Sequence, residues 1–360
     1  IVLGIAILMY VFVIAFQNKK VIFTTVAAIL IILLGIFIPN VIFPLPDPAI
    51  NFHTYAITHS LFEIINWNVI MIYLGSMMIA SMFIYSKVPA RIADAIVNSS
   101  RNVGVAIVAI LAMTGIISIF VENVATVLVM APIALALCKK IKLNPTLFMV
   151  GLAVMSNLEG TATLVGDPPS MIFASFVGYN FNDFFIHNGK LSIFFVIQAG
   201  LLVGCIYFYF FFAKNGKQKI EVEKTPVISW LPFIILLVMI FGLALLSFVK
   251  IDFAYLSGTY VLCLGIITLV WFKFAQKKSA KEVLSVIKEL DWETIFFLLG
   301  IFVVVGAIQE IGLLDDFAHF LARITSGSKI AAFIIILVVS VMMISAGSRF
   351  SHFALFGSVG

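Results

Sequence analysis

The chain has 360 residues, of which 63% are hydrophobic and only 11% are charged, with a formal net charge of +5. Its mean hydropathy is +1.19. A water-soluble core of this length would need far more polar cover, so the composition excludes a soluble globular protein and indicates a helical protein that crosses a membrane several times. The apolar runs are long and continuous rather than alternating, which excludes a membrane β-barrel. The three cysteines lack metal-ligand spacing and are expected to be small buried hydrophobes.

Apolar runs recur along the chain and are separated by polar loops. They cover residues 1–16, 21–38, 67–85, 191–212, 227–248, 255–272 and 292–308, the last being the last clear span, and two interrupted runs cover 103–137 and 147–177. Lysine and arginine gather at residues 19–20, 87–101, 139–142, 214–224 and 273–288. Short loops rich in these residues mark the cytoplasmic side of a membrane. We therefore expect N-terminal spans and an external loop in residues 1–65, a cytoplasmic linker in 214–226, and connecting spans with a basic loop in 227–289.

A short internal repeat is visible in the sequence. Trp67 is followed eight residues later by Gly75, and Trp292 is followed eight residues later by Gly300, so both pairs are offset by 225. By the loop charges the first copy begins outside and the second begins inside. Inverted repeats of this kind are typical of secondary transporters, whose binding site lies near the midplane where the repeats meet. The sequence therefore predicts a first repeat in residues 66–213 and the start of a second, inverted repeat in 290–360.

The run at residues 103–138 is interrupted by Glu122 and Asn123. Its second arm, residues 124–137, would reach only about 21 Å as a helix, against a hydrocarbon core of about 30 Å. We therefore expect a re-entrant hairpin that enters and leaves from the cytoplasm, with Asn123 capping the second arm. A carboxylate such as Glu122 is costly in a membrane unless it is paired, protonated or solvated. It is either a functional group or a carboxylate that holds the hairpin closed.

The run at residues 147–177 is interrupted between Gly160 and Asp167. Asp before Pro168 is a strong helix-start signal, so we expect one helix to stop near Gly160 and another to restart at Asp167. Free carbonyls in the unwound stretch suit Na⁺, and the N-terminus of a half-helix suits an anion. The alternative is a proline kink that binds nothing, but a simple kink does not need the polar side chains found here: Ser156, Asn157, Glu159, Thr161 and Thr163. Asp167 is either a cap only or a direct ligand.

Three stretches together resemble a known family: Phe-Val-Glu-Asn-Val-Ala-Thr at 120–126, Met-Ala-Pro-Ile at 130–133, and Gly-Thr-Ala-Thr-Leu-Val-Gly-Asp-Pro-Pro at 160–169. They resemble the arsenite permease and Na⁺/H⁺ antiporter branch (ArsB/NhaD) of the ion-transporter superfamily, which also holds citrate–metal and dicarboxylate–sodium carriers. Over roughly residues 39–346 the resemblance implies a helical bundle with two re-entrant hairpins and two broken helices. It implies site roles for Asn123, Thr126, Ser156, Asn157, Gly160, Thr161 and Thr163. The sequence departs from the family at Glu122, where Asp is usual, and at Glu159, where Gly is common, and the extra carboxylate can alter which ion is accepted.

The sequence thus predicts an all-α polytopic membrane protein, an inverted-topology repeat transporter with re-entrant hairpins and broken helices. The expected function is secondary active transport of a small inorganic or carboxylate ion across the cytoplasmic membrane, coupled to Na⁺ or H⁺, with a Na⁺/H⁺ antiporter as the alternative. The expected ion-binding residues are Glu122, Asn123, Thr126, Ser156, Asn157, Glu159, Gly160, Thr161, Thr163 and Asp167. No cofactor is expected, and Na⁺ is the one metal ion considered, at Asn123 and Thr161. The expected partners are the small ion and the lipid bilayer, without nucleic acid, and a homodimer is left open.

Two other functions are less consistent with the sequence. An intramembrane aspartyl protease would need Gly two residues before Gly166, where Leu164 stands, and no zinc-protease helix or serine nucleophile elbow occurs. We therefore do not expect an enzyme. A channel is disfavoured by the inverted repeat around broken helices.

The end of the sequence departs from the expected second repeat. The counterpart of Glu122 and Asn123 would fall just after Ala346, where residues 347–352 read Gly-Ser-Arg-Phe-Ser-His. No acidic-Asn pair, second hairpin arm or second broken helix follows. We expect the second repeat to be truncated, through a fragment or a shifted reading frame after Ala346.

Overall fold

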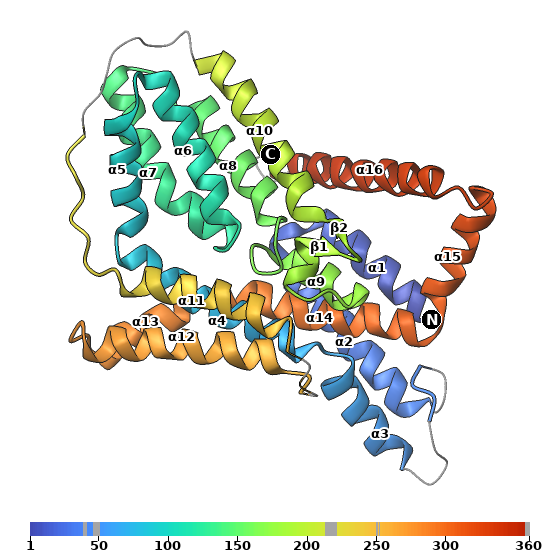
Figure 1. Ribbon diagram of the computed structural model, residues 1–360. Coiled ribbons are helices and arrows are strands. Elements are labelled where there is room, and N and C mark those ends of the chain that lie inside the picture. Colours follow the sequence, from blue (N-terminus) through green and yellow to red (C-terminus); the bar gives the residue numbers. More distant parts are fainter. Residues whose placement is uncertain (39–41, 46–50, 213–221, 250, 252, 357–360) are drawn as a thin grey trace. The chain divides into compact units, whose positions relative to one another are not determined.

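The computed structural model describes residues 1–38, 42–45, 51–212, 222–249, 251 and 253–356, and only the backbone of residues 17, 141 and 343–356 (Figure 1). The chain divides into two compact units. Unit 1 comprises Ile1–Asn66 with Glu293–Gly360, and unit 2 comprises Trp67–Trp292. Six helical segments among the described residues are long and apolar enough to cross a membrane, or seven when the bent pair near residue 325 is counted as one span. The predicted all-α polytopic fold is confirmed.

Unit 1 is built from helices at both ends of the chain. They are α1 (Val2–Ala15), the short 3-10 turn η1 (Gln17–Lys19), α2 (Lys20–Phe37), α3 (Phe52–Thr58), the π-helical turn η2 (His59–Glu63), α14 (Trp292–Glu310), α15 (Leu313–Ile324) and α16 (Lys329–Phe356). In η2, the buried His59 lies between two carboxylates, with Nδ1 2.5 Å from Glu63 and Nε2 3.2 Å from Glu310. This cluster ties the N-terminal segment to α14 within the unit.

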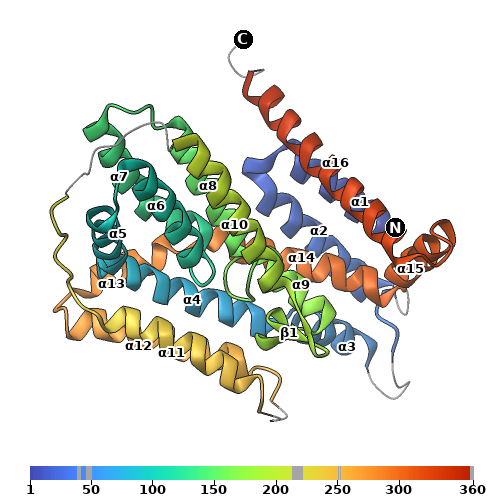
Figure 2. The same ribbon diagram turned by 45° about the horizontal axis from the view of Figure 1, so that its top comes forward.

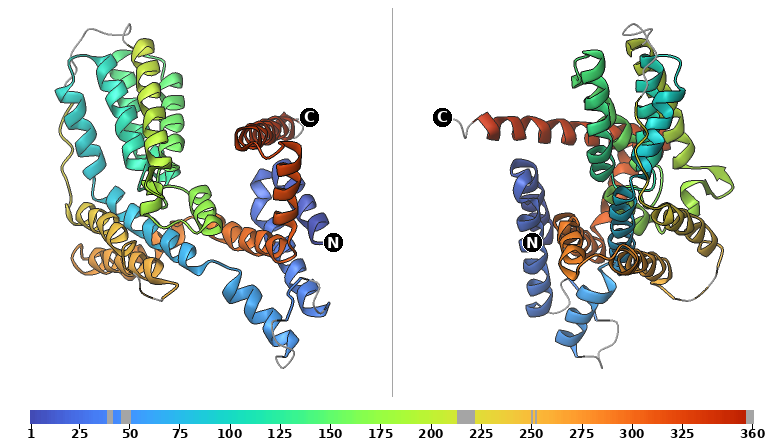
Figure 3. Two further views of the ribbon diagram at one scale, coloured as in Figure 1. Left: turned by 45° about the vertical axis from the view of Figure 1, so that its right-hand side comes forward. Right: turned by 90° about the vertical axis from the view of Figure 1, so that its left-hand side faces the viewer.

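Unit 2 holds both interrupted runs of the sequence. Its elements are α4 (Trp67–Tyr85), α5 (Val88–Ser99), α6 (Val103–Ser118), α7 (Asn123–Ile141), α8 (Thr146–Gly160), α9 (Pro168–Val177), η3 (Asn182–Phe184), the antiparallel strands β1 (Ile186–His187) and β2 (Lys190–Leu191), α10 (Ile193–Phe212), α11 (Leu231–Leu246), α12 (Leu256–Phe274) and α13 (Ala280–Glu289). The helices α6, α7, α8 and α10 lie side by side around a shared apolar core (Figure 2). On the other side of the unit, α12 lies along α4 and α11 (Figure 3).

The two glycines of the internal repeat make the same kind of contact, each within its own unit. A Cβ added at Gly75 would lie 2.6 Å from the carbonyl carbon of Val261 on α12, and one added at Gly300 would lie 2.9 Å from that of Thr24 on α2. Each glycine therefore lets a neighbouring helix approach backbone to backbone, as small residues commonly do between membrane helices.

Helix lengths also repeat along the chain. The helices α4 and α14 each have 19 residues, and the α5 and α15 helices that follow each have 12. The α14 helix starts at Trp292, 225 residues after the start of α4, and α15 starts at Leu313, 225 residues after the start of α5. The Trp and Gly match found in the sequence is therefore part of a repeated succession of elements. The orientation of the two copies in a membrane stays a prediction.

Two expectations from the sequence were wrong in detail. The basic stretches 87–101 and 273–288 are not simple loops, because they contain the amphipathic helices α5 and α13. The α5 helix buries Val88, Ala93 and Val97, and its Asp94 accepts a 2.7 Å hydrogen bond from the N–H of Thr225. Residues 292–308 lie in the last of the six candidate spans, as expected, and a further apolar helix, α16, follows as part of the bent pair. Short helices with mixed charge, and an apolar run that leads into polar residues, are easily missed by hydropathy alone.

Two further expectations fall on residues that the structure does not describe. Most of the predicted linker 214–226 lies outside the described residues, which resume at residue 222. The residues after Ala346, where the sequence departs from the expected second repeat, belong to the backbone of α16, and their side chains are outside the described part of the chain.

Candidate functional site

The first part of the site is the tip of the α6–α7 hairpin. The α6 helix ends at Ser118 and α7 begins at Asn123, so four residues form the turn. The Glu122 carboxylate caps α7 by accepting a 2.9 Å hydrogen bond from the N–H of Ala125. The expectation that Asn123 is the cap was therefore wrong. Both residue types cap helices well, and here the cap is one residue earlier, which frees the Asn123 amide for tertiary contacts.

The length of α7 also differs from the expectation. The arm was predicted as residues 124–137, but α7 spans 19 residues, about 28 Å at the usual helical rise. It is extended by Asn123 at its start and by Cys138, Lys139, Lys140 and Ile141 at its end. The argument from a short arm therefore does not hold, and the re-entrant character of the hairpin stays a prediction.

The second part of the site is the break between α8 and α9, which lies where the sequence predicts it. The α8 helix ends at Gly160, and α9 starts at Pro168 with Asp167 as its cap, whose carboxylate accepts a 3.0 Å hydrogen bond from the N–H of Ser170. Both Pro168 and Asp167 thus have their predicted start roles. Within the break, the Thr163 hydroxyl accepts a 3.3 Å hydrogen bond from the N–H of Val165.

The hairpin tip and the break are in direct contact. The buried Thr163 hydroxyl donates a 2.6 Å hydrogen bond to the carbonyl of Ile119 in the hairpin turn. A Cβ added at Gly166 would lie 2.9 Å from the same carbonyl oxygen and would also overlap the carbonyl of Gly160. Gly166 therefore lets three backbone segments meet at one point. Irregular backbone at membrane depth is tolerated where protein covers it, and here each break covers the other.

Asn123 is the centre of a hydrogen-bonded polar cluster. Its Oδ1 accepts a 2.7 Å hydrogen bond from the Ser118 hydroxyl, and its Nδ2 donates a 3.2 Å hydrogen bond to Asn157. Its backbone carbonyl accepts a 3.1 Å hydrogen bond from Ser156, and the two serine hydroxyls are 2.9 Å apart. Gly160 packs directly on the Asn123 amide, since any Cβ there would overlap it. We call Ser118, Asn123, Ser156, Asn157 and Gly160 the asparagine cluster.

Several helix ends converge on this cluster. The α7 and α9 helices begin here, where the carboxylates of Glu122 and Asp167 cap them, and the last turn of α8 presents carbonyl groups. A helix carries a partial positive charge at its N-terminus and a partial negative charge at its C-terminus. Together with the amide and hydroxyl oxygens, the carbonyl end of α8 offers oxygen ligands of the kind that suit a small cation.

Four candidate residues lie elsewhere or have another local role. Thr126 is buried below the tip, where its hydroxyl lies 3.4 Å from the carbonyl of Val121. The Thr161 hydroxyl donates a 2.7 Å hydrogen bond back to Leu158. Glu122 lines a cavity of about 200 Å³ together with residues of α4 and with Glu289 and Asp291. Glu159 is fully buried on a different face of α8, where it meets α10 rather than the asparagine cluster.

Two residues of the site were not predicted. Ser118 bonds both Asn123 and Ser156, and its position five residues before Asn123 at a hairpin tip could have indicated it. Gln198 on α10 donates a 2.6 Å hydrogen bond to Glu159. An amide within the otherwise apolar run 193–212 is the signal that could have identified it, because polar groups in membrane helices need a partner.

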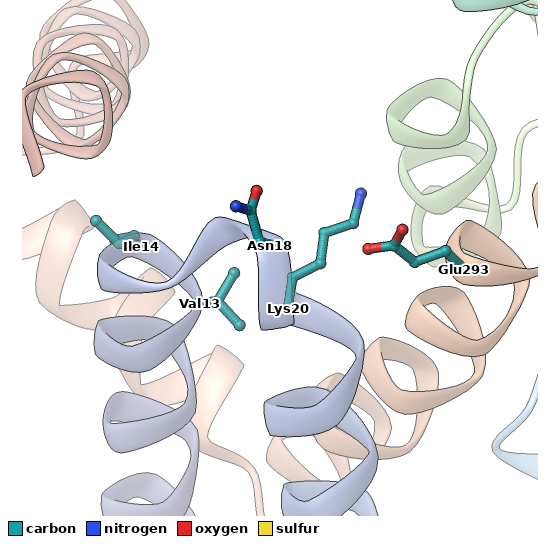
Figure 4. Close-up of a pocket in the computed structure, with 5 residues that line it drawn as sticks. All are labelled: Val13, Ile14, Asn18, Lys20 and Glu293. Atoms are coloured by element: carbon teal, nitrogen blue, oxygen red, sulfur yellow. The ribbon is translucent and has the colours of Figure 1, made fainter. Parts of the chain in front are cut away.

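A separate cavity, of about 740 Å³, lies in unit 1 and contains none of the candidate residues. It is lined by Val13, Ile14, Asn18, Lys20 and Glu293 (Figure 4). The Lys20 and Glu293 side chains extend toward the same space (Figure 4). The cavity is wide, and its charged lining consists of this one residue of each sign, so it does not resemble the compact polar cluster of unit 2.

The apolar helices and the hydrogen-bonded contact between two helix breaks define a polytopic α-helical membrane protein with a polar site inside its helix bundle. The comparison with known families agrees with this class. Residues 2–349 match the model of the citrate transporter family. The chain belongs to this family. The match does not identify the arsenite permease and Na⁺/H⁺ antiporter branch, which stays a proposal.

Similar proteins are found in several bacteria. The uncharacterized transporter Rv2685 of Mycobacterium tuberculosis is 30% identical over 278 residues, which cover 77% of this chain and 64% of that protein. The 46 kDa membrane protein of Mycobacterium leprae is 27% identical over 293 residues, covering 78% and 65%. The magnetosome protein MamN of Magnetospirillum gryphiswaldense is 27% identical over 274 residues, covering 70% and 57%. The matched part of the chain thus spans less than two thirds of the length of these relatives.

Proposed function

We propose that the protein moves a small inorganic or carboxylate ion across the cytoplasmic membrane by secondary active transport, coupled to Na⁺ or H⁺. The observation that carries the proposal is the asparagine cluster, where three helix ends and a set of amide and hydroxyl groups meet between two apolar helix pairs. In transporters built from repeats, broken helices of this kind hold the substrate and the coupling ion. Membership of the citrate transporter family and the names of the relatives support the same function.

Within this function, Na⁺ fits near Asn123 and the carbonyl end of α8 beside Thr161. Hard cations of this kind prefer oxygen ligands, and amide, hydroxyl and backbone oxygens are all present there. An anionic substrate would instead be held by the N-terminus of α7 with the Asn123 amide and the Ser118 and Ser156 hydroxyls.

A Na⁺/H⁺ antiporter of the kind found in the arsenite permease and antiporter branch is the second candidate. It is favoured by the carboxyl groups of Glu122 and Asp167, which cap the helices that begin at the contact between the two breaks, and by the lack of Lys, Arg and His among the ten candidate residues. A site with this balance suits cations and protons better than anions. An antiporter needs no anionic substrate, so the two candidates differ in a measurable way.

Ion flux in proteoliposomes tests the proposal. The purified protein is reconstituted into liposomes. The fluxes of Na⁺, H⁺, arsenite, sulfate and citrate are then measured under imposed Na⁺ or pH gradients. We expect gradient-driven movement of at least one ion, lost in Asn123→Ala and kept in Gly200→Ala. Proton movement driven by Na⁺ alone would favour the antiporter. If none of these ions moves, or if the protein cleaves peptide substrates instead, the proposed transport function is contradicted.

A further inference from the structure

Glu159 is a buried carboxyl group that the asparagine cluster does not use. Its exposed fraction is 0%, and it lies between α8, α6 and α10 in the apolar core of unit 2. A Cβ added at Gly115 on α6 would lie 2.8 Å from the Glu159 Cγ, so this glycine makes room for the side chain. The core thus contains a fitted position for a glutamate.

The hydrogen bonds of Glu159 suit a neutral acid rather than a carboxylate. Its Oε2 lies 2.6 Å from Nε2 of Gln198, while its buried Oε1 has no hydrogen-bond partner among the described residues. An ionised carboxylate has two oxygens that both require donors, and a buried charge without a cation is strongly disfavoured. A protonated acid needs a single acceptor, which the Gln198 amide offers when its oxygen and nitrogen exchange places.

Among the described residues, no cationic side chain interacts with Glu159. Among the residues that the structure describes, Cys205 on α10 is the titratable group that faces Glu159. The α6 helix presents Gly115 there, and α8 presents Met155. A thiol supplies no positive charge, so the acid keeps its proton while α8 and α10 are packed together.

We propose that Glu159 and Gln198 form a proton-binding pair and that the proton they hold is the coupling ion of transport. This inference rests on the proposed function. Glu159 directly precedes Gly160, which packs on Asn123, and lies three residues after Ser156, which bonds the same residue. Release of the proton to water leaves a carboxylate that must be hydrated, which requires α10 to separate from α8. That movement shifts the last turn of α8 and with it the ligands of the asparagine cluster.

The protonation state can be measured directly by infrared spectroscopy of the protein in lipid at neutral pH. We expect the carbonyl band of a protonated carboxylic acid that is lost in Glu159→Gln and kept in Glu223→Gln, a matched change at an exposed glutamate. Gln198→Leu should shift the band to higher frequency, because the acid loses its hydrogen bond. An acid band of equal intensity and frequency in all of these proteins would overturn the proposal that Glu159 and Gln198 bind a proton.

The coupling role is measured in proteoliposomes that contain a pH-sensitive dye. We expect the number of protons moved per substrate ion to fall at least about tenfold in Glu159→Gln, because glutamine keeps the bond to Gln198 but carries no exchangeable acid proton. The ratio should be unchanged in Glu223→Gln. An unchanged ratio in Glu159→Gln would overturn the coupling role while leaving transport itself established. Absence of ion flux in the wild-type protein would instead contradict the proposed function, and the infrared band would still decide whether the pair binds a proton.

Discussion

The contact between Gly160 and Asn123 gives the sharpest structural prediction, through the substitution Gly160→Ala. The added Cβ would overlap the Asn123 amide and would lie 2.7 Å from its Cγ, whereas carbon atoms normally approach to about 3.5–4.0 Å. The amide must therefore move by about 1 Å, which breaks its bonds to Ser118 and Asn157. Overpacking costs about 1–3 kcal/mol. Each lost hydrogen bond costs about 0.5–1.5 kcal/mol. We expect a total loss of about 2–6 kcal/mol, by summing these ranges.

A double-mutant cycle distinguishes this contact from a general effect of alanine. Asn123→Ala alone loses the hydrogen bonds but creates space, so it should cost about 1–3 kcal/mol. The combination with Gly160→Ala should cost much less than the sum of the two, because the added methyl group then has room. Ion flux should stay lost in both single mutants and in the double mutant. The assay is unfolding in detergent at matched protein concentration, followed by flux in liposomes.

Gly200→Ala on α10 is the matched control for this cycle. Its added Cβ would meet only the end of the Leu158 side chain, at 3.3 Å, which can rotate away. Replacing glycine inside a helix also gains about 0.5–1 kcal/mol, so we expect no net loss of stability. Equal losses in Gly160→Ala and Gly200→Ala, or strictly additive losses in the double mutant, would refute the reasoning.

Four further predictions concern other parts of the structure. Gly75→Ala should destabilise unit 2 by about 1–3 kcal/mol or more, because the added Cβ would overlap the backbone of α12. The assay is unfolding in detergent, and an unchanged stability would contradict this contact. Glu122→Gln should shift the pH dependence of flux if the carboxylate carries a proton, and an unchanged pH profile would remove Glu122 from the site. Thr161→Ala should lower flux at equal expression, and wild-type flux would remove Thr161 from the site. Hydrogen bonds from the Ser279 N–H and then from Lys278 lower the pKa of the exposed Glu282 from 4.5 to about 2, so its stabilisation of α13 is complete above pH 4.5 and is lost as pH falls through about 2. An NMR titration of Glu282 should show its pKa rise part of the way toward 4.5 in Lys278→Ala, which removes the second of these bonds, and an unchanged value would contradict its contribution.

The parts of the fold that follow local rules were predictable from the sequence. The apolar run that begins at Trp67 matches α4 at both ends, and Asp167 before Pro168 starts α9 as expected. The chemistry at these positions is contained in neighbouring residues, so no tertiary information is needed. The amphipathic α5 and α13 helices were missed because hydropathy averages their apolar and charged faces.

The site was predicted less completely, because side-chain direction depends on helix phase and on partners distant in sequence. Ser156 and Gly160 are four residues apart and share the face of α8 that meets Asn123. Glu159 is rotated by about 100° from Gly160 on the same helix, which places it toward α10. That rotation could have been worked out from the sequence. The bond from Gln198 to Glu159 could not, because it depends on how α8 packs against α10.

The central claim, that the transported or coupling ion binds at the asparagine cluster, is tested most directly by ion-dependent thermal stabilisation of the purified protein. An ion at about 100 times its dissociation constant should stabilise the folded state by about 2.7 kcal/mol. The account predicts that at least one of Na⁺, arsenite, sulfate and citrate raises the melting temperature of the wild type and of Gly200→Ala, and does not raise that of Asn123→Ala. An equal rise in Asn123→Ala would show that the ion binds elsewhere and would contradict the account.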